Sequence, residues 1–121
     1  MKKLIFVAGP VRGDGSKEAK QKNIEIAKKF ILVLIANNIP YYSPHLNIDQ
    51  EIISLGEEAS KLAWDMNAEF LRRCDGLAVL PGWETSSGTK MEIENATKLS
   101  LPVFYLEKES AIGDILDWIK N

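Results

Sequence analysis

Short apolar runs alternate along the chain with longer segments of helical periodicity. The clearest runs are Leu4–Ala8, Gly76–Leu80 and Pro102–Leu106, and a shorter candidate lies at Pro40–Ser43. A short, continuous apolar run is typical of a strand that is buried on both faces of a sheet. The pattern therefore predicts four strands.

The segments between these runs have the spacing of helices. In the first, Ile24, Ala27, Ile31 and Leu34 fall on one face, and in the second Leu62, Met66 and Phe70 recur every four residues as an expected core face. The helices are predicted at Lys17–Asn38, Glu57–Arg73, Thr89–Leu99 and Ala111–Lys120, and a polar stretch, His45–Gly56, follows the break at Pro44.

Strands that alternate with helices predict a parallel sheet with right-handed crossovers and helices on both faces. A length of 121 residues suits one domain with one core, so we expect a single domain over residues 1–121. One stretch points beyond the monomer, because Phe30–Ala36 is apolar all round its helix. We expect a homodimer or higher homo-oligomer; the alternative is a helix sandwiched within the domain.

Composition narrows the possible partners. A net charge of −2 and a pI near 5.4, with mixed charges, give no basic stripe for a phosphate backbone, so nucleic acid is not an expected partner. Apolar runs shorter than a membrane span and a lone Cys74 predict a cytoplasmic protein without disulfides. One histidine, one cysteine and scattered carboxylates also predict no metal site. We expect no cofactor.

Two loops carry candidate chemistry. The loop after the first strand contains Gly9, Pro10, Arg12 and Gly13 ahead of a helix amino terminus, where backbone amides cradle anions. Its spacing fits neither GxxxxGK[ST] nor GxGxxG, so neither an ATPase nor a dinucleotide enzyme is indicated. The alternative is a turn whose glycines only permit positive φ.

The loop after the third strand leads into Glu92, which the predicted helix places in its first turn. Ligands of open α/β sheets bind at the carboxyl ends of strands, so Glu92 is expected at the mouth of a crevice, near Ser86, Ser87 and Gly88. The alternative is a capping box, Thr89 to Glu92, in which the carboxylate only stabilises the helix.

Aromatic side chains and the single histidine complete the candidates. Trp83 lies on the same loop and is expected to stack on a base, whereas Trp64 and Trp118 are expected to pack on helices. His45 follows Pro44 near the crevice, where it either contacts a ligand or makes a structural hydrogen bond.

These motifs together resemble the nucleoside 2-deoxyribosyltransferase-like superfamily, in particular its small bacterial and phage members. The resemblance spans about Lys3 to Leu106, and its most specific part is Leu80 to Glu92. The motifs are Ala8-Gly9-Pro10, Arg12-Gly13, Ser43-Pro44-His45-Leu46, Leu71-Arg72-Arg73-Cys74-Asp75 and Leu80-Pro81-Gly82-Trp83-Glu84 with Ser86, Gly88 and Glu92.

The resemblance implies a Rossmann-like (flavodoxin-like) three-layer sandwich with a four- to five-stranded parallel sheet. It also implies cleavage of the N-glycosidic bond of a nucleoside or nucleoside 5′-monophosphate, with Glu92 as nucleophile. Ser86 to Gly88 would line the sugar or phosphate side, and Arg12-Gly13 with a serine would hold a 5′-phosphate.

The sequence departs from the transferase pattern at three positions. Phe6 replaces a tyrosine that orients the nucleophile, Asn67 replaces an aspartate, and Ser86 replaces another aspartate. An amide is no general acid, so either Asp65, two residues before Asn67, takes that role, or Asp65 is a solvated helix residue. If no residue protonates the base, the alternative function is a non-catalytic nucleotide-binding or sensing module.

Overall fold

The computed structural model of the protein describes residues 3–47 and 55–121. Within these residues one sheet is formed by β1 (Ile5–Ala8), β2 (Tyr41–Tyr42), β3 (Gly76–Val79) and β4 (Val103–Tyr105). The strand order is β2-β1-β3-β4 and every pairing is parallel. The predicted parallel α/β architecture is confirmed, with four strands.

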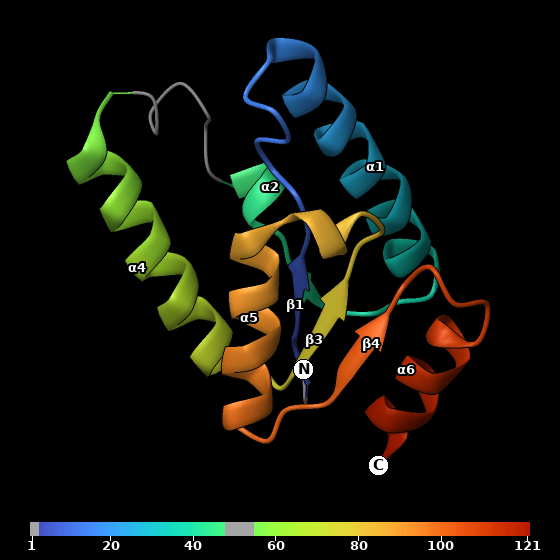
Figure 1. The fold of residues 1–121 in the computed structure, drawn as a ribbon. Coiled ribbons are helices and arrows are strands. Elements are labelled where there is room, and N and C mark those ends of the chain that lie inside the picture. The colour runs from blue at the N-terminus through green and yellow to red at the C-terminus, as the bar shows by residue number, and fades with distance from the viewer. Residues whose placement is uncertain (1–2, 48–54) are drawn as a thin grey trace.

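Helices cover both faces of the sheet. They are α1 (Lys17–Ala36), α2 (Pro44–Asn47), α4 (Glu57–Arg73), α5 (Ser87–Lys98) and α6 (Ala111–Lys120), with a short 3-10 turn, η1 (Trp83–Thr85), before α5. Figure 1 shows α1 and α6 on one side of the sheet and α4 and α5 on the other. This is the Rossmann-like three-layer arrangement that we expected.

The central strands β1 and β3 are buried on both faces because their side chains alternate between two cores. Ile5 and Val7 pack toward α1 and α6, whereas Phe6 and Ala8 pack toward α4 and α5. All four are at most 1% exposed. This double burial explains why the strand reads as a continuous apolar run.

Two predicted boundaries in the first half of the chain differ from the observed ones. The first helix ends at Ala36, because Asn37 caps it and Asn38 adopts a left-handed φ of 59°. Pro44 begins α2 instead of opening a loop, since proline is well suited to the first position of a helix. Residues 48–54 of the expected polar stretch lie outside the described residues.

The apolar stripe of α4 does not face the core, contrary to our expectation. Leu62, Met66 and Phe70 are 62%, 43% and 38% exposed, and Leu71 is the residue of α4 that is fully buried. Phe70 stacks instead on Tyr42 of the edge strand, with ring centroids 4.3 Å apart. The face of α4 that points inward therefore contains other residues.

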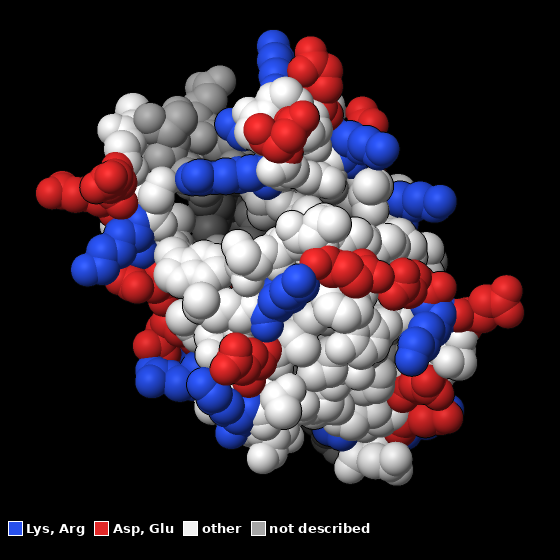
Figure 2. Space-filling view, in the orientation of Figure 1, with Lys and Arg blue, Asp and Glu red and all other residues white. Residues whose placement is uncertain are grey.

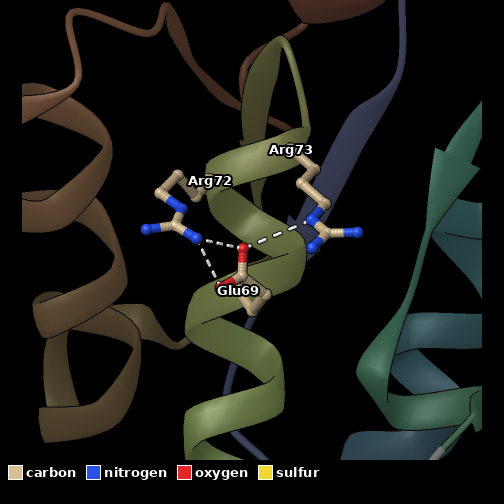
Figure 3. Close-up of polar contacts among 3 residues, drawn as sticks. All are labelled: Glu69, Arg72 and Arg73. Carbon is tan, nitrogen blue, oxygen red and sulfur yellow. Dashed lines mark hydrogen bonds and ion pairs between the residues drawn. The ribbon is translucent and has the colours of Figure 1, made fainter.

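The end of α4 is tied to the sheet by Asp75. Its Oδ2 accepts a hydrogen bond from the Leu4 backbone N–H at 2.8 Å, and its own N–H donates to the Leu4 carbonyl at 2.8 Å. The neighbouring arginines lie at the surface, where Arg72 and Arg73 both bind the Glu69 carboxylate on the outside of α4 (Figure 3). This part of the motif is structural.

Candidate active site

A pocket of about 910 Å³ opens at the carboxyl ends of β1 and β3. Figure 2 shows the hollow between α4 and the top of α5, with a basic side chain lying across it. Its volume is within the range of small-molecule sites. Of the residues expected at a site, the lining includes Gly9, Pro10, Arg12, Gly13, His45, Asn67, Ser86, Ser87, Gly88 and Glu92.

Glu92 is the interior carboxyl of this pocket. Burial raises the pKa of Glu92 to about 8, because the charged form loses its hydration. No described residue forms a hydrogen bond or ion pair with its carboxylate that would offset this cost. An unpaired carboxyl in a ligand-sized pocket is a group poised for chemistry with a ligand.

The start of α5 decides between the two readings of Glu92. The helix begins at Ser87, two residues earlier than predicted, because the Ser86 hydroxyl is the N-cap. Ser86 Oγ accepts hydrogen bonds from Thr89 N at 3.2 Å and from Thr89 Oγ1 at 2.8 Å. Glu92 therefore lies in the second turn, too far along the helix to close a capping box.

The loop after β1 crosses the pocket mouth. A turn closes it, since the Gly15 N–H donates to the Arg12 carbonyl at 2.9 Å and Gly13 and Gly15 have φ of 57° and 88°. The Arg12 side chain is exposed and donates from Nη2 to Ser60 Oγ on α4 at 3.3 Å. The turn is observed and Arg12 lines the pocket, whereas anion binding by this loop stays a prediction.

His45 joins α2 to the first loop. It is 5% exposed, and its Nε2–H donates to the Pro10 carbonyl at 2.8 Å. This contact assigns the proton to Nε2, and Nδ1 is buried with no hydrogen-bond partner. Burial lowers the pKa of His45, so the ring is neutral at pH 7.

The inward face of α4 is formed by Ser60, Ala63, Trp64 and Asn67, at helical spacing. Asn67 has a buried amide oxygen with no partner. The Trp64 indole lies over Gly88, where an added Cβ would come within 3.3 Å of the ring. Sequence reasoning missed Trp64 as a pocket residue because the neighbouring stripe of Leu62 and its companions is more apolar.

Two expected site residues lie outside the pocket. Asp65 is exposed on α4 and is not part of the lining. Trp83 packs on Tyr105, with ring centroids 5.3 Å apart, and its Nε1–H donates to Glu107 at 3.4 Å. The aromatic wall of the pocket is thus formed by Trp64, not by Trp83.

Neither a metal cluster nor a membrane helix appears in the part of the chain that the structure describes. No group of three or more metal-binding side chains occurs among residues 3–47 and 55–121. Within the same residues, every helix is too short or too polar to cross a bilayer.

The fold and the pocket define an α/β protein with a pocket at the carboxyl edge of a parallel sheet, where proteins of this class typically bind ligands. The chain belongs to the family described as a domain of unknown function (DUF7768), which matches residues 3–106. No curated protein matches it.

Among solved structures, the chain is similar to a 2-deoxyribosyltransferase from the psychrotolerant bacterium Bacillus psychrosaccharolyticus. The TM-score is 0.63 at 20% sequence identity, over 84% of this chain and 70% of that one. At this identity the similarity establishes a shared fold. It agrees with the superfamily resemblance in the sequence and leaves the activity to be argued from the site.

Proposed function

We propose that the protein cleaves the N-glycosidic bond of a nucleoside or nucleoside 5′-monophosphate, with Glu92 as nucleophile. The observation that carries this proposal is the position of Glu92, the interior carboxyl of a pocket of about 910 Å³ at the carboxyl edge of the sheet. The similarity to a 2-deoxyribosyltransferase fold supports it.

The chemistry requires an ionised carboxylate at the anomeric carbon. Glu92 attacks C1′ as the bond to the base breaks through an oxocarbenium-like transition state, and a glycosyl ester forms on the carboxylate. Water then resolves the ester in a hydrolase, whereas a second base resolves it in a transferase. Because burial raises the pKa of Glu92 to about 8, a bound ligand must favour its charged form at neutral pH.

The phosphate of a nucleotide fits the mouth of the pocket. Helix geometry leaves the N–H groups of Ser87 and Gly88 without an intrahelical acceptor, and a helix amino terminus attracts anions. Arg12 lies on the opposite rim, within reach of Ser60. These groups together favour a 5′-monophosphate over an uncharged nucleoside.

A second candidate is a nucleotide-binding module without catalysis. Phe6 is fully buried in the core, and Asn67 offers an amide where a general acid would stand. Neither residue supplies an acid for a leaving base, although the pocket itself is present. In such a module Glu92 has no role in chemistry, and Glu92→Gln retains most of the affinity for the nucleotide.

Base release separates the two functions. Ribo- and deoxynucleosides and their 5′-monophosphates would be incubated with the wild-type protein, with and without a second free base, and the released base measured by chromatography. The proposal expects release by the wild type and none by Glu92→Gln. Glu94→Gln is the matched control, because Glu94 is exposed on the same helix.

Nucleotide binding measured on the same variants interprets a negative result in the base-release assay. If no substrate is cleaved and Glu92→Gln binds a nucleotide as well as the wild type, the protein is a binding module.

A further inference from the structure

We propose that the bond cleaved at this site joins the sugar to a base that already carries a positive charge, as in a pyridinium N-riboside. The inference rests on the proposed N-glycosidic function and deepens it by naming the class of leaving group. It is carried by the absence, among the described lining residues, of a second carboxylic acid or a cationic imidazole that could protonate a leaving base, and by the position of Glu92 in the pocket.

The described lining contains two carboxyl groups, Glu92 and Asp14. Asp14 is exposed at the mouth, where its Oδ1 accepts a hydrogen bond from the Ser16 backbone N–H at 2.8 Å, and these contacts lower its pKa. It is therefore ionised at neutral pH and donates no proton. Glu92 cannot act as both the nucleophile and the acid in the same step.

The two polar side chains with buried unpartnered atoms, Asn67 and His45, do not fill the role of an acid. Asn67 is an amide, and His45 is a neutral imidazole whose Nε2–H is already donated to the Pro10 carbonyl. Its second nitrogen, Nδ1, carries a lone pair and no proton. A neutral nucleobase would thus have to leave as an anion, which is a difficult step.

A cationic base removes this difficulty. As a Glu92 carboxylate oxygen forms its bond to C1′, the electron pair of the C1′–N bond moves to the ring nitrogen, and the base departs as a neutral molecule without taking up a proton. Water then attacks C1′ of the ester, which frees the carboxylate and the sugar. Each turnover consumes one water and releases one proton.

The charges of the pocket match such a ligand. A cation beside Glu92 would favour its carboxylate form, because an opposite charge within about 4–6 Å stabilises ionisation. The face of Trp64 attracts a flat cation by cation–π interaction. Arg12 and Lys61, both exposed at the lining, are placed for the anionic phosphate of the same molecule.

Cleavage of matched substrates tests the inference. The probes are nicotinamide riboside 5′-monophosphate, its reduced dihydropyridine form, which has nearly the same shape without the ring charge, and inosine 5′-monophosphate. We expect the oxidised pyridinium compound to be cleaved with a kcat/KM at least about 100-fold above the other two. One proton should appear per base released, measured with a pH indicator in weak buffer.

Glu92→Gln should abolish this reaction and Glu94→Gln should retain it. If inosine 5′-monophosphate is cleaved as fast as the pyridinium nucleotide, the N-glycosidase function stands and the cationic leaving group is overturned. If the folded wild type cleaves none of the three, nor any substrate of the base-release panel, both proposals are overturned.

A binding measurement provides a readout besides activity. 1-Methylnicotinamide is a cation and nicotinamide is its uncharged counterpart, so calorimetry in two buffers of different ionisation enthalpy measures protons released on binding. At pH 7 we expect 1-methylnicotinamide to bind more tightly and to release close to one proton from the wild type and none from Glu92→Gln. Equal affinities without proton release would contradict the inference.

Discussion

Burial without a partner distinguishes Glu92 from the other glutamates of its surroundings. Glu69 and Glu94 are exposed and form ion pairs with arginine or lysine one turn away. Such exposed pairs contribute little to stability. Glu92 has no such pair, so its environment penalises the charged form and gives this one residue a large effect on the pH dependence of the protein.

Glu92 should make the protein less stable as the pH rises. Its folded pKa of about 8 lies above the value of 4.5 for an exposed glutamate, so its contribution to stability is complete below pH 4.5 and is lost as pH rises through 8. The free energy of unfolding should fall by about 1.4 kcal/mol for each pH unit between 5 and 7. Urea unfolding between pH 5 and 8.5 measures it.

Glu92→Gln should remove this slope, and Glu94→Gln should leave it unchanged. His45 contributes with the opposite sign, because its lowered pKa makes the folded state less tolerant of acid, and it affects all three proteins equally. The difference between the wild type and Glu92→Gln therefore isolates Glu92. Parallel curves for these two proteins would show that Glu92 has an ordinary pKa.

The two tryptophans near the pocket should respond differently to truncation. Trp64→Ala should weaken binding of a nucleoside 5′-monophosphate by up to about tenfold, because the aromatic wall is lost. Trp83→Ala should leave affinity unchanged and lower stability, because it removes the contact with Tyr105. Titration calorimetry and urea unfolding of both variants would reveal the opposite pattern if Trp83 were the stacking residue.

At the scale of elements, the close approach of β1 and β3 is fixed by a glycine. A Cβ on Gly9 would lie 2.7 Å from the Cβ of Leu80, a distance that forces one strand to move. Gly113, in the first turn of α6, has no atom within 4 Å of a Cβ built at its position. The two positions form a matched pair.

Gly9→Ala should lower the free energy of unfolding by about 1–3 kcal/mol, as overpacking does in a core. Gly113→Ala should raise it by roughly 0.5–1 kcal/mol, because alanine is the better helix former. Chemical denaturation of both variants at one pH measures the pair. A neutral Gly9→Ala would mean that the first loop is free to shift.

The sequence predicted β1 and β3 well because both strands are buried on both faces, so each reads as a continuous apolar run. It predicted Glu92 at the pocket because the segment that follows a central strand of a parallel sheet starts at the carboxyl edge of the sheet, where ligands bind. It was less successful on α4, where Leu62, Met66 and Phe70 are exposed. Periodicity identifies an apolar face but does not say what that face contacts.

The same limit explains why Trp64 lines the pocket and Trp83 does not. Trp83 lies on the loop between β3 and α5, close in sequence to Ser86 and Ser87, but η1 turns it toward β4 and the Glu107 side chain. Trp64 is remote in sequence, and the packing of α4 against α5 brings it over Gly88. The position of Trp64 in the pocket wall depends on how α4 packs against α5, and no local sequence pattern encodes that packing.

At the scale of the whole molecule, α1 carries an apolar surface that the chain does not cover. Leu32, Val33 and Ile35 are 65%, 40% and 53% exposed, whereas the opposite face of the helix is buried. Lysines and acidic residues are interspersed over the face that Figure 2 shows, without a basic stripe. Self-association through α1 therefore stays our prediction.

Sedimentation velocity tests this prediction directly. We expect a dimer or larger assembly for the wild type, and Leu32→Glu should shift it to the monomer by placing a charge in the interface. Lys22→Glu is the matched control, because Lys22 is exposed on the same helix almost three turns before Leu32. A monomeric wild type at all concentrations would contradict the prediction.

The attachment of α4 has a consequence for how the pocket opens. Leu71 anchors its carboxyl-terminal end, while the turns that carry Ser60 and Trp64 have no fully buried side chain. Local opening needs little energy where few contacts are lost. Amides in the first half of α4 should exchange with deuterium far faster than those near Leu71. The α4 wall of the pocket would thus open locally from its amino-terminal half and admit ligands while the sheet stays folded.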